Sequence, residues 1–387
     1  MNSSLSIRAS LVSTRDIQRA GRQARLSADA TEMKPTKRQE PKTEGSPERA
    51  RSLAPRWLRG LFVDLLARPP YERERELWTD KPVPELVESL LSQSEFWEEW
   101  VQTQLYYFLL VDNFRPESEA LLQLPERLRA GQSGVTEALL RIALCASFDR
   151  RNPGADTFVT VVMEQLLGIE VQKNTRQLEI GKHVYEGGRG KFLGVMGSSQ
   201  ADVVKIAIED DRCLERFIER EYERLILATL NERDVKGYAD ALRAGDRPYR
   251  EILKEWLLSD AYAQRFELRA ELPNRVFARS LFVDLFDRLP DTEEVRRIRS
   301  ALDGLGDAGP LRSALVRILL DSGKVSLPTR DEIESPTKWI RASFVRYFGR
   351  QPTEEELDTF RESFRDPVCR PETVVYALLT HPEYASR

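Results

Sequence analysis

The stretch Leu61-Phe62-Val63-Asp64-Leu65 occurs a second time, letter for letter, as Leu281-Phe282-Val283-Asp284-Leu285. After each copy an arginine and a proline follow at the same spacing, and a third segment keeps that spacing although its letters differ. A pattern that recurs in this way marks a repeated supersecondary unit, and helical repeats more often build binding surfaces than catalytic sites. The recurring positions are Phe62, Arg68 and Pro70; Phe282, Arg288 and Pro290; and Phe344, Arg350 and Pro352.

Each recurring segment predicts a helix that ends at a turn. Proline cannot continue the hydrogen-bond ladder, so Arg68-Pro69-Pro70 is expected to end the first helix. An acidic helix start follows the turn, and a later helix closes the unit. We therefore predict an all-α fold of irregular helical repeats, with a central helical insert that carries a glycine-rich loop. The first helix face, with three- and four-residue spacing, consists of Trp57, Leu58, Leu61, Phe62, Leu65 and Leu66.

The recurring pattern divides the chain into six segments. Residues 1–52 hold 11 Lys/Arg against 6 Asp/Glu and no aromatic residue, so we expect a disordered basic tail with too little apolar surface to offset the entropy of ordering. A degenerate copy lacks the Arg-x-Pro element. The remaining segments are helical repeat 1 at 53–112, the central helical segment at 113–215, degenerate repeat 2 at 216–270, repeat 3 at 271–327 and repeat 4 at 328–387.

Composition narrows the classes of function. The 387 residues are 41% hydrophobic and 32% charged with a formal net charge of −4, which argues against nucleic acid as a partner. Three scattered cysteines without a CxxC motif, and two histidines, lead us to expect no metal site, no haem and no other cofactor. No apolar run reaches the ~20 residues of a membrane span. The N-terminus also lacks the hydrophobic segment of a secretory signal, so we expect a cytoplasmic protein.

The central segment carries the only glycine-dense stretch, with six glycines between 181 and 197. Backbone N–H groups at a helix start can bind an anion. Arg189 and Lys191 lie beside the predicted start, while Ser198 and Ser199 open the helix in the style of a capping box. The stretch matches neither GxxxxGK[ST] nor GxGxxG. A tight turn therefore competes with an anion site formed by Arg189, Lys191, Ser198 and Ser199.

We identify no catalytic residues in the sequence. His183 and Tyr185 stand beside the glycine-rich stretch, and acid–base chemistry would require a carboxylate partner. The neighbouring carboxylates are Glu179, Glu186 and Asp202. A surface histidine is the simpler interpretation. In the same segment, the β-branched run at 156–163 fits a strand or a helix, and the residues after it favour a helix.

The repeated arginines Arg68, Arg288 and Arg350 have two interpretations. Each follows an apolar helix, so it could bond the last carbonyls of that helix and complement the helix dipole. Alternatively, each could pair with a recurring acid such as Glu95 or Glu355. Both versions are structural, and contact with a partner protein is the alternative.

The unit Phe-x-x-Leu/Phe-x-Arg-x-Pro, with its acidic helix start and its closing Leu-Leu-x-Ser/His-x-Glu-Phe/Tyr, resembles the short α-helical repeats of the DUF4214 and phycobilisome-linker-like group. The resemblance covers about half of the chain in pieces and implies scaffolding or surface-associated modules. In the last copy it is carried by Phe344, Phe348, Arg350, Pro352, Glu355, Leu378, Leu379, Glu383 and Tyr384.

A second resemblance covers residues 85–115. The run from Leu90 to Trp100, followed by Leu105-Tyr106-Tyr107 and Asn113, is similar to the start of DUF1549-type domains. Those domains occur in large bacterial proteins that often carry cytochrome modules, although the cysteine–histidine haem motif of such modules is absent from this chain. Neither resemblance supplies catalytic residues.

From the repeats we expect a non-enzymatic scaffold or protein-interaction protein that is a subunit of a larger bacterial assembly. Its partners would be other proteins, and its basic tail could also touch a membrane surface. One alternative is a ligand-binding protein or enzyme with an anion site at 179–205. The other is an accessory component of a redox or surface assembly.

Overall fold

The computed structural model describes residues 47–386, apart from 112–113, 269 and 305–307, and it describes side chains from Pro55 onward. Most of the predicted disordered tail therefore lies outside the described residues. Helix α2 spans Pro47–Leu66 and so begins within residues 47–52, the last part of the predicted tail. Good helix formers (Glu, Arg, Ala and Leu) dominate positions 48–54, and they extend the helix ahead of its apolar face.

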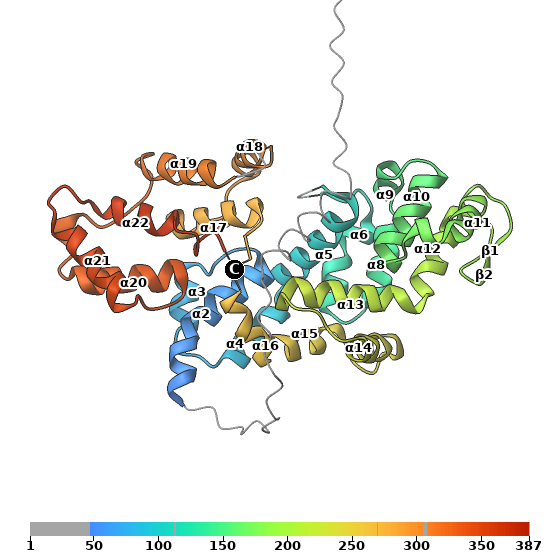
Figure 1. Cartoon of the computed structure of the whole chain (residues 1–387), viewed down its shortest axis with the longest axis horizontal. Coiled ribbons are helices and arrows are strands. Elements are labelled where there is room, and N and C mark those ends of the chain that lie inside the picture. The colour runs from blue at the N-terminus through green and yellow to red at the C-terminus, as the bar shows by residue number, and fades with distance from the viewer. Residues whose placement is uncertain (1–46, 112–113, 269, 305–307, 387) are drawn as a thin grey trace, which may run out of the picture. The chain divides into compact units, whose positions relative to one another are not determined.

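The fold is all-α, as predicted, and the described residues form helices α2 to α22 with one short hairpin (Figure 1). None of the described helices is long and apolar enough to cross a membrane. The first part after α2 comprises α3 (Glu72–Trp78), α4 (Val83–Ser92), α5 (Ser94–Leu109), α6 (Glu119–Leu122), α7 (Leu124–Arg129), α8 (Val135–Ala143) and α9 (Ala146–Arg151).

The middle of the chain comprises α10 (Ala155–Val161), the π-helix η1 (Val162–Leu166), the 3-10 helix η2 (Val171–Lys173), α11 (Thr175–Tyr185), strands β1 (Gly190–Phe192) and β2 (Val195–Gly197), and α12 (Gln200–Glu209). It continues with α13 (Asp211–Ile226), α14 (Glu232–Ala244), α15 (Tyr249–Leu257), α16 (Asp260–Gln264) and the 3-10 helix η3 (Arg265–Glu267). The β-branched run at 156–163 is thus helical, as predicted.

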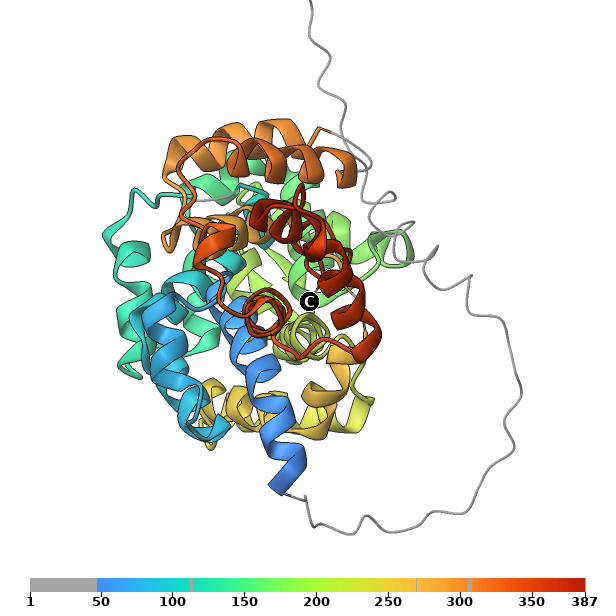
Figure 2. The same cartoon turned by 90° about the vertical axis from the view of Figure 1, so that its left-hand side faces the viewer.

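The last part comprises α17 (Asn274–Phe286), α18 (Thr292–Leu302), α19 (Gly309–Leu320), the 3-10 helix η4 (Arg330–Glu332), α20 (Pro336–Phe348), α21 (Glu354–Arg365) and α22 (Pro371–Leu379). These helices, orange to red, face the viewer in Figure 2.

Two main hydrophobic cores hold the described residues together. The first runs from Trp57 to Tyr262 and includes the central segment. The second runs from Leu272 to Tyr384 and also takes in Val63 of α2. Helix α2 therefore turns Leu61 and Phe62 into the first core and Val63 into the second. Burial of apolar surface on both sides of one helix is the main force that joins the cores.

Six described helices are followed directly by a left-handed residue, and four of these ends share the same short turn to the next helix. Helices α2, α13, α17 and α20 each end at a residue in the left-handed region: Ala67 (φ 53°), Leu227 (φ 60°), Asp287 (φ 52°) and Gly349 (φ 67°). A left-handed residue just past a helix reverses the chain and lets its N–H bond a carbonyl of the last turn. The next helix has its N-cap four residues later in every case, at Tyr71, Asn231, Asp291 and Thr353.

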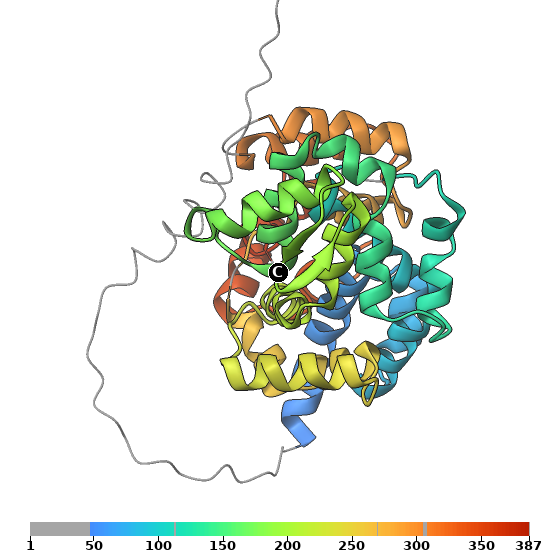
Figure 3. The same ribbon diagram turned by 90° about the vertical axis from the view of Figure 1, so that its right-hand side faces the viewer.

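The glycine-rich stretch forms a β-hairpin rather than an irregular loop (Figure 3). Lys191 pairs with Met196, and the two turn residues Leu193 (φ 47°) and Gly194 (φ 91°) both have positive φ. Positive φ at both positions is the type I′ geometry that suits the twist of a two-residue hairpin. Gly181 on α11 lets the hairpin approach, because a Cβ there would lie 2.9 Å from the ring of the buried Phe192.

Candidate functional site

The predicted anion site at the start of α12 is already occupied by a carboxylate of the chain itself. Asp202 Oδ2 accepts a 2.8 Å hydrogen bond from the backbone N–H of Ser198, and Ser199 Oγ accepts one of 3.1 Å from the N–H of Asp202. The bond from the Ser198 backbone, together with Ser199, holds the pKa of Asp202 below its usual value. An incoming anion would therefore meet a negative charge at these N–H groups.

The two basic residues of the predicted site are exposed. Lys191 lies on β1 and Arg189 precedes it, next to the paired glycines Gly190 and Gly197. Within the described residues, no hydrogen bond or ion pair joins either base to Ser198 or Ser199. The structure thus assigns Ser199 to helix capping, bonds the backbone N–H of Ser198 to Asp202, and leaves Arg189 and Lys191 on the surface.

Tyr185 is hydrogen-bonded to Asp149, a carboxylate that was not among the candidates from the sequence. Its hydroxyl donates to Asp149 Oδ1 at 3.3 Å, and Gln200 Nε2 donates to the same oxygen at 2.8 Å. Burial and the nearby Asp149 raise the pKa of Tyr185. His183 is exposed and packs against Gly188, where a Cβ would lie 2.2 Å from the imidazole. None of the described residues forms a group of three potential metal ligands.

The aspartate of the first Leu-Phe-Val-Asp-Leu copy is the centre of a buried polar cluster. Asp64 accepts from Arg265 Nη1 and Nη2 at 2.6 and 3.0 Å, and from the Tyr262 hydroxyl at 2.7 Å. The Asp64 and Arg265 side chains are only 1% and 0% exposed. A charge pair this deep is tolerated only because each charge compensates the other and the oxygens are hydrogen-bonded.

The aspartate of the second copy repeats this arrangement in the other core. Asp284 accepts from Arg59 at 2.9 and 3.2 Å and from the Tyr384 hydroxyl at 2.8 Å. Burial and Asp284 together raise the pKa of Tyr384 well above its ordinary value. Neither cluster was expected from the sequence. The recurrence of Tyr-Ala at 262–263 and 384–385 marks the tyrosine of each cluster, whereas Arg59, the cation of the second cluster, comes from another segment.

A third contact also recurs between these segments. Arg224 of α13 donates to the backbone oxygen of Asp64 at 3.5 Å, and Arg346 of α20 donates to the backbone oxygen of Asp284 at 2.7 Å. Each Leu-Phe-Val-Asp-Leu helix is thus held by the next repeat along the chain, through an arginine and a tyrosine of that repeat. Arg224 and Tyr262 make these two contacts beside the first hydrophobic core, and Arg346 and Tyr384 make them beside the second.

The repeated arginines form a second kind of cluster, which we call the arginine clamp. In the first clamp, Arg68 Nε and Nη2 donate to Glu95 at 2.7 Å each, and Nη1 and Nη2 donate to Glu74 at 2.6 and 3.0 Å. In the last, Arg350 Nε and Nη2 donate to Glu383 at 2.6 Å each, and Nη1 and Nη2 donate to Glu356 at 2.8 Å each. Planar bidentate pairing is the strong geometry for a guanidinium.

The expectation that these arginines bond the last carbonyls of their own helices is wrong. Arg68 and Arg350 bond the carbonyl of the next residue instead, at Pro69 and Gln351. The left-handed residue before each arginine turns the chain, so the guanidinium reaches the start of the following helix. Of the suggested acids, Glu95 is a partner, whereas Glu355 is replaced by its neighbour Glu356.

The remaining recurring positions support the clamps. Phe62, Phe282 and Phe344 are buried, and the guanidinium carbons of Arg68, Arg288 and Arg350 lie 5.4, 5.1 and 5.5 Å from their ring centroids. Contacts of this kind add cation–π attraction. Pro70, Pro290 and Pro352 each directly precede the N-cap of the following helix, where their missing N–H costs no helical hydrogen bond.

The third clamp is incomplete. Arg288 Nη1 and Nη2 donate to Glu294 at 2.7 and 2.8 Å. Aligned on the Leu-Leu pair that closes each unit, Lys324 stands where the other clamps have Glu95 and Glu383. Among the described residues, Nε of Arg288 has no acceptor, and the side chain is 49% exposed.

A titration tests the clamp that is complete in the last unit. The hydrogen bond from Arg350 is the main cause that lowers the pKa of Glu356 to about 2 from the ordinary 4.5. The lower folded-state pKa means that ionised Glu356 stabilises the fold in full above about pH 4.5, and this contribution disappears as the pH falls toward about 2. We expect Glu356→Gln to lower the melting temperature at pH 7 by about 1–3 °C.

The difference between wild type and Glu356→Gln should shrink steadily below pH 4.5. Thermal unfolding followed by circular dichroism across this pH range measures it. Glu355→Gln is the matched control, because Glu355 is exposed, neighbours Glu356 on the same helix and accepts no bond from Arg350. An equal loss in the two variants would contradict the clamp.

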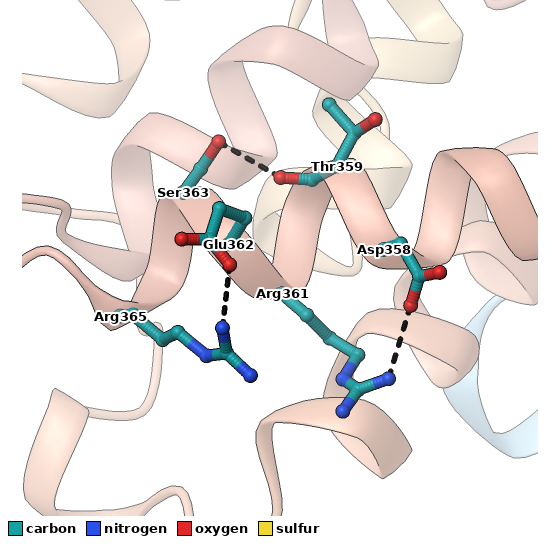
Figure 4. Close-up of a pocket in the computed structure, with 6 residues that line it drawn as sticks. All are labelled: Asp358, Thr359, Arg361, Glu362, Ser363 and Arg365. Atoms are coloured by element: carbon teal, nitrogen blue, oxygen red, sulfur yellow. Dashed lines mark hydrogen bonds and ion pairs between the residues drawn. The ribbon is translucent and has the colours of Figure 1, made fainter.

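A polar hollow of about 650 Å³ runs along α21 (Figure 4). Its charged side chains pair within the helix, Arg361 with Asp358 at 3.0 Å and Arg365 with Glu362 at 2.6 Å. Such exposed pairs three residues apart are common on solvent-facing helices. All the lining residues belong to one helix, so the hollow brings no groups together from different elements.

Comparison with known proteins supplies no relative: no family model, no curated protein and no solved structure matches the chain.

Proposed function

We propose that the protein is a non-enzymatic scaffold that binds other proteins within a larger bacterial assembly. The observation that supports this proposal is the use of the recurring charged residues. Asp64, Asp284, Arg68 and Arg350 are all engaged in clusters that tie helices together. Polar groups fully engaged inside the chain hold a rigid framework, and rigid helical frameworks offer extended surfaces for partners.

Exposed apolar side chains at one helix end add to this support. Tyr106, Leu110 and Val111 at the end of α5 are 45%, 52% and 46% exposed. Large apolar side chains that stay exposed next to one another are typical of protein interaction sites. They belong to the segment that resembles DUF1549-type domains, most of whose other aromatic residues, such as Trp97 and Trp100, pack in the core.

The rival proposal, an anion-binding protein or enzyme with its site at 179–205, has less support. Its helix start already carries Asp202, and Ser199 caps the helix. The hairpin geometry also accounts for several of the glycines through turn conformation and close packing.

The scaffold proposal predicts a stable protein complex. We expect the tagged full chain, cross-linked in cells, to form repeated cross-links to the same partner, and the purified pair to migrate as one species in size-exclusion chromatography. An unrelated bait of equal net charge is the control for electrostatic capture. A full chain that stays monomeric and yields the same cross-links as the control bait would contradict the proposal.

A further inference from the structure

The incomplete clamp at Arg288 lies in a surface hollow of about 440 Å³. Its lining residues come from the end of α17, from the segment 324–326 and from α20. The hollow therefore brings together groups from different elements, unlike the hollow along α21. The lining residues are Leu285, Phe286, Asp287, Arg288, Lys324, Ser326 and Arg346. Three of these seven are cationic, and two are apolar.

The negative groups near the hollow are already engaged. Glu294 holds Arg288 through Nη1 and Nη2. Asp287 Oδ1 accepts from the backbone N–H of Glu72 at 2.7 Å, which caps α3. Glu72 itself accepts from Arg346 at 3.1 Å. Arg288 therefore keeps its Nε and one Nη2 hydrogen directed at no acceptor among the described residues.

The chain itself shows what fits this edge. In the two complete clamps, the Nε and Nη2 edge receives both oxygens of a glutamate, Glu95 on Arg68 and Glu383 on Arg350. The first and last clamps each hold one arginine and two glutamates. The third holds Arg288, Glu294 and, at the aligned position, Lys324, so it carries two positive charges and one negative charge. One added carboxylate would neutralise it.

We propose that the hollow beside Arg288 binds the carboxylate of a glutamate from an acidic segment of a partner protein. The carboxylate takes the place that Glu95 and Glu383 take in the complete clamps, bidentate on Nε and Nη2 of Arg288, with Lys324 as a second cation. This inference rests on the proposed scaffold function and names the contact through which one partner docks.

A blocked peptide with the sequence of residues 92–96, Ser-Gln-Ser-Glu-Phe, is the probe. The full chain is labelled with ¹⁵N-arginine, and the Nε–Hε resonance of Arg288 is identified by its loss in Arg288→Gln. We expect the peptide to shift this resonance, and the same peptide with glutamine in place of glutamate to leave it unchanged. No shift with the glutamate peptide, or an equal shift with both peptides, would overturn the proposal.

Lys324→Glu supplies the missing carboxylate from within the chain. We expect it to raise the melting temperature and to weaken peptide binding about tenfold or more, since a charged bidentate bond is lost to the peptide. Lys324→Gln is the matched control, because it removes the charge without supplying a carboxylate, and it should weaken binding less. A Lys324→Glu variant that binds the peptide as well as Lys324→Gln does would contradict the assigned position.

Two further measurements distinguish a carboxylate ligand from phosphate, and failure of the Arg288 site from failure of the scaffold function. Inorganic phosphate at equal ionic strength should shift the Arg288 resonance less than the glutamate peptide, and a stronger shift would replace the carboxylate with a phosphate ligand. If Arg288→Gln and wild type recover the same partner equally, the scaffold function stands and this inference fails. If no partner is recovered while the peptide shifts Arg288, the scaffold function fails and the carboxylate site stands.

Discussion

Arg265→Met is expected to reduce the free energy of unfolding by about 3–5 kcal/mol, because it leaves the buried Asp64 charge without its cation. Arg265 and Asp64 are joined by two hydrogen bonds in a region closed to solvent. Methionine fills similar space but cannot compensate the carboxylate. Tyr262 still donates one bond, which lowers the penalty without removing it. Denaturant unfolding measures the loss.

Two further variants are controls for the loss of stability in Arg265→Met. Arg361→Met removes an exposed pair with Asp358, and it should cost less than about 1 kcal/mol. The double variant Asp64→Leu with Arg265→Met replaces both charges by apolar groups, and it should recover much of the stability that Arg265→Met loses. A loss below about 1 kcal/mol for Arg265→Met alone would show that Asp64 is not held as a buried charge.

Gly349→Ala should be strongly destabilising, although it adds a single carbon. Gly349 has φ 67°, and an added Cβ would lie 2.9 Å from the backbone oxygen of Pro55 and 3.0 Å from Cα of Arg56. The left-handed conformation costs a residue with a Cβ about 1–2 kcal/mol. The contact with the backbone of α2 cannot be relieved by a side-chain rotation, so forced packing adds about 1–3 kcal/mol.

Gly245→Ala is the matched control for this change. Gly245 has φ 74° at the end of α14, and nothing lies within 4 Å of the added Cβ. It should lose only the conformational part, so Gly349→Ala should be less stable than Gly245→Ala by about 1–3 kcal/mol in the same unfolding assay. Equal losses would mean that α20 does not approach α2 this closely.

Local patterns were sufficient for the all-α class and for the helix ends at the proline turns. The three- and four-residue spacing of Trp57 to Leu66 predicted α2, and the residues after the run at 156–163 correctly favoured a helix. These predictions succeeded because helix formation depends on neighbours within one or two turns. The start of α2 at Pro47 was missed, since charged and apolar-poor residues such as 48–51 favour both a helix and a solvated tail.

The hairpin at 190–197 shows where local patterns fail. Its strands are three residues each, and its turn begins with Leu193, whereas Asn-Gly or Asp-Gly is the usual signal for such a turn. The fit of Phe192 against Gly181 decides the structure. That contact lies outside any local window, so glycines that serve packing were interpreted as a candidate anion site.

By itself the sequence determined the all-α class, the proline turns and the recurrence of Phe, Arg and Pro, because each depends on residues a few positions apart. Only the tertiary structure decided which charges meet. Asp64 and its partner Arg265 are 201 positions apart in sequence, and Arg350 and its partner Glu383 are 33 positions apart. The hydrophobic pattern cannot specify such pairs. From the sequence, an aspartate on an apolar helix is expected to face solvent, because the arginine that compensates its buried charge lies far away in the chain. The tertiary structure also shows that Nε of Arg288 lacks an acceptor among the described residues. In the two complete clamps, a glutamate distant in sequence, Glu95 or Glu383, binds this side of the guanidinium.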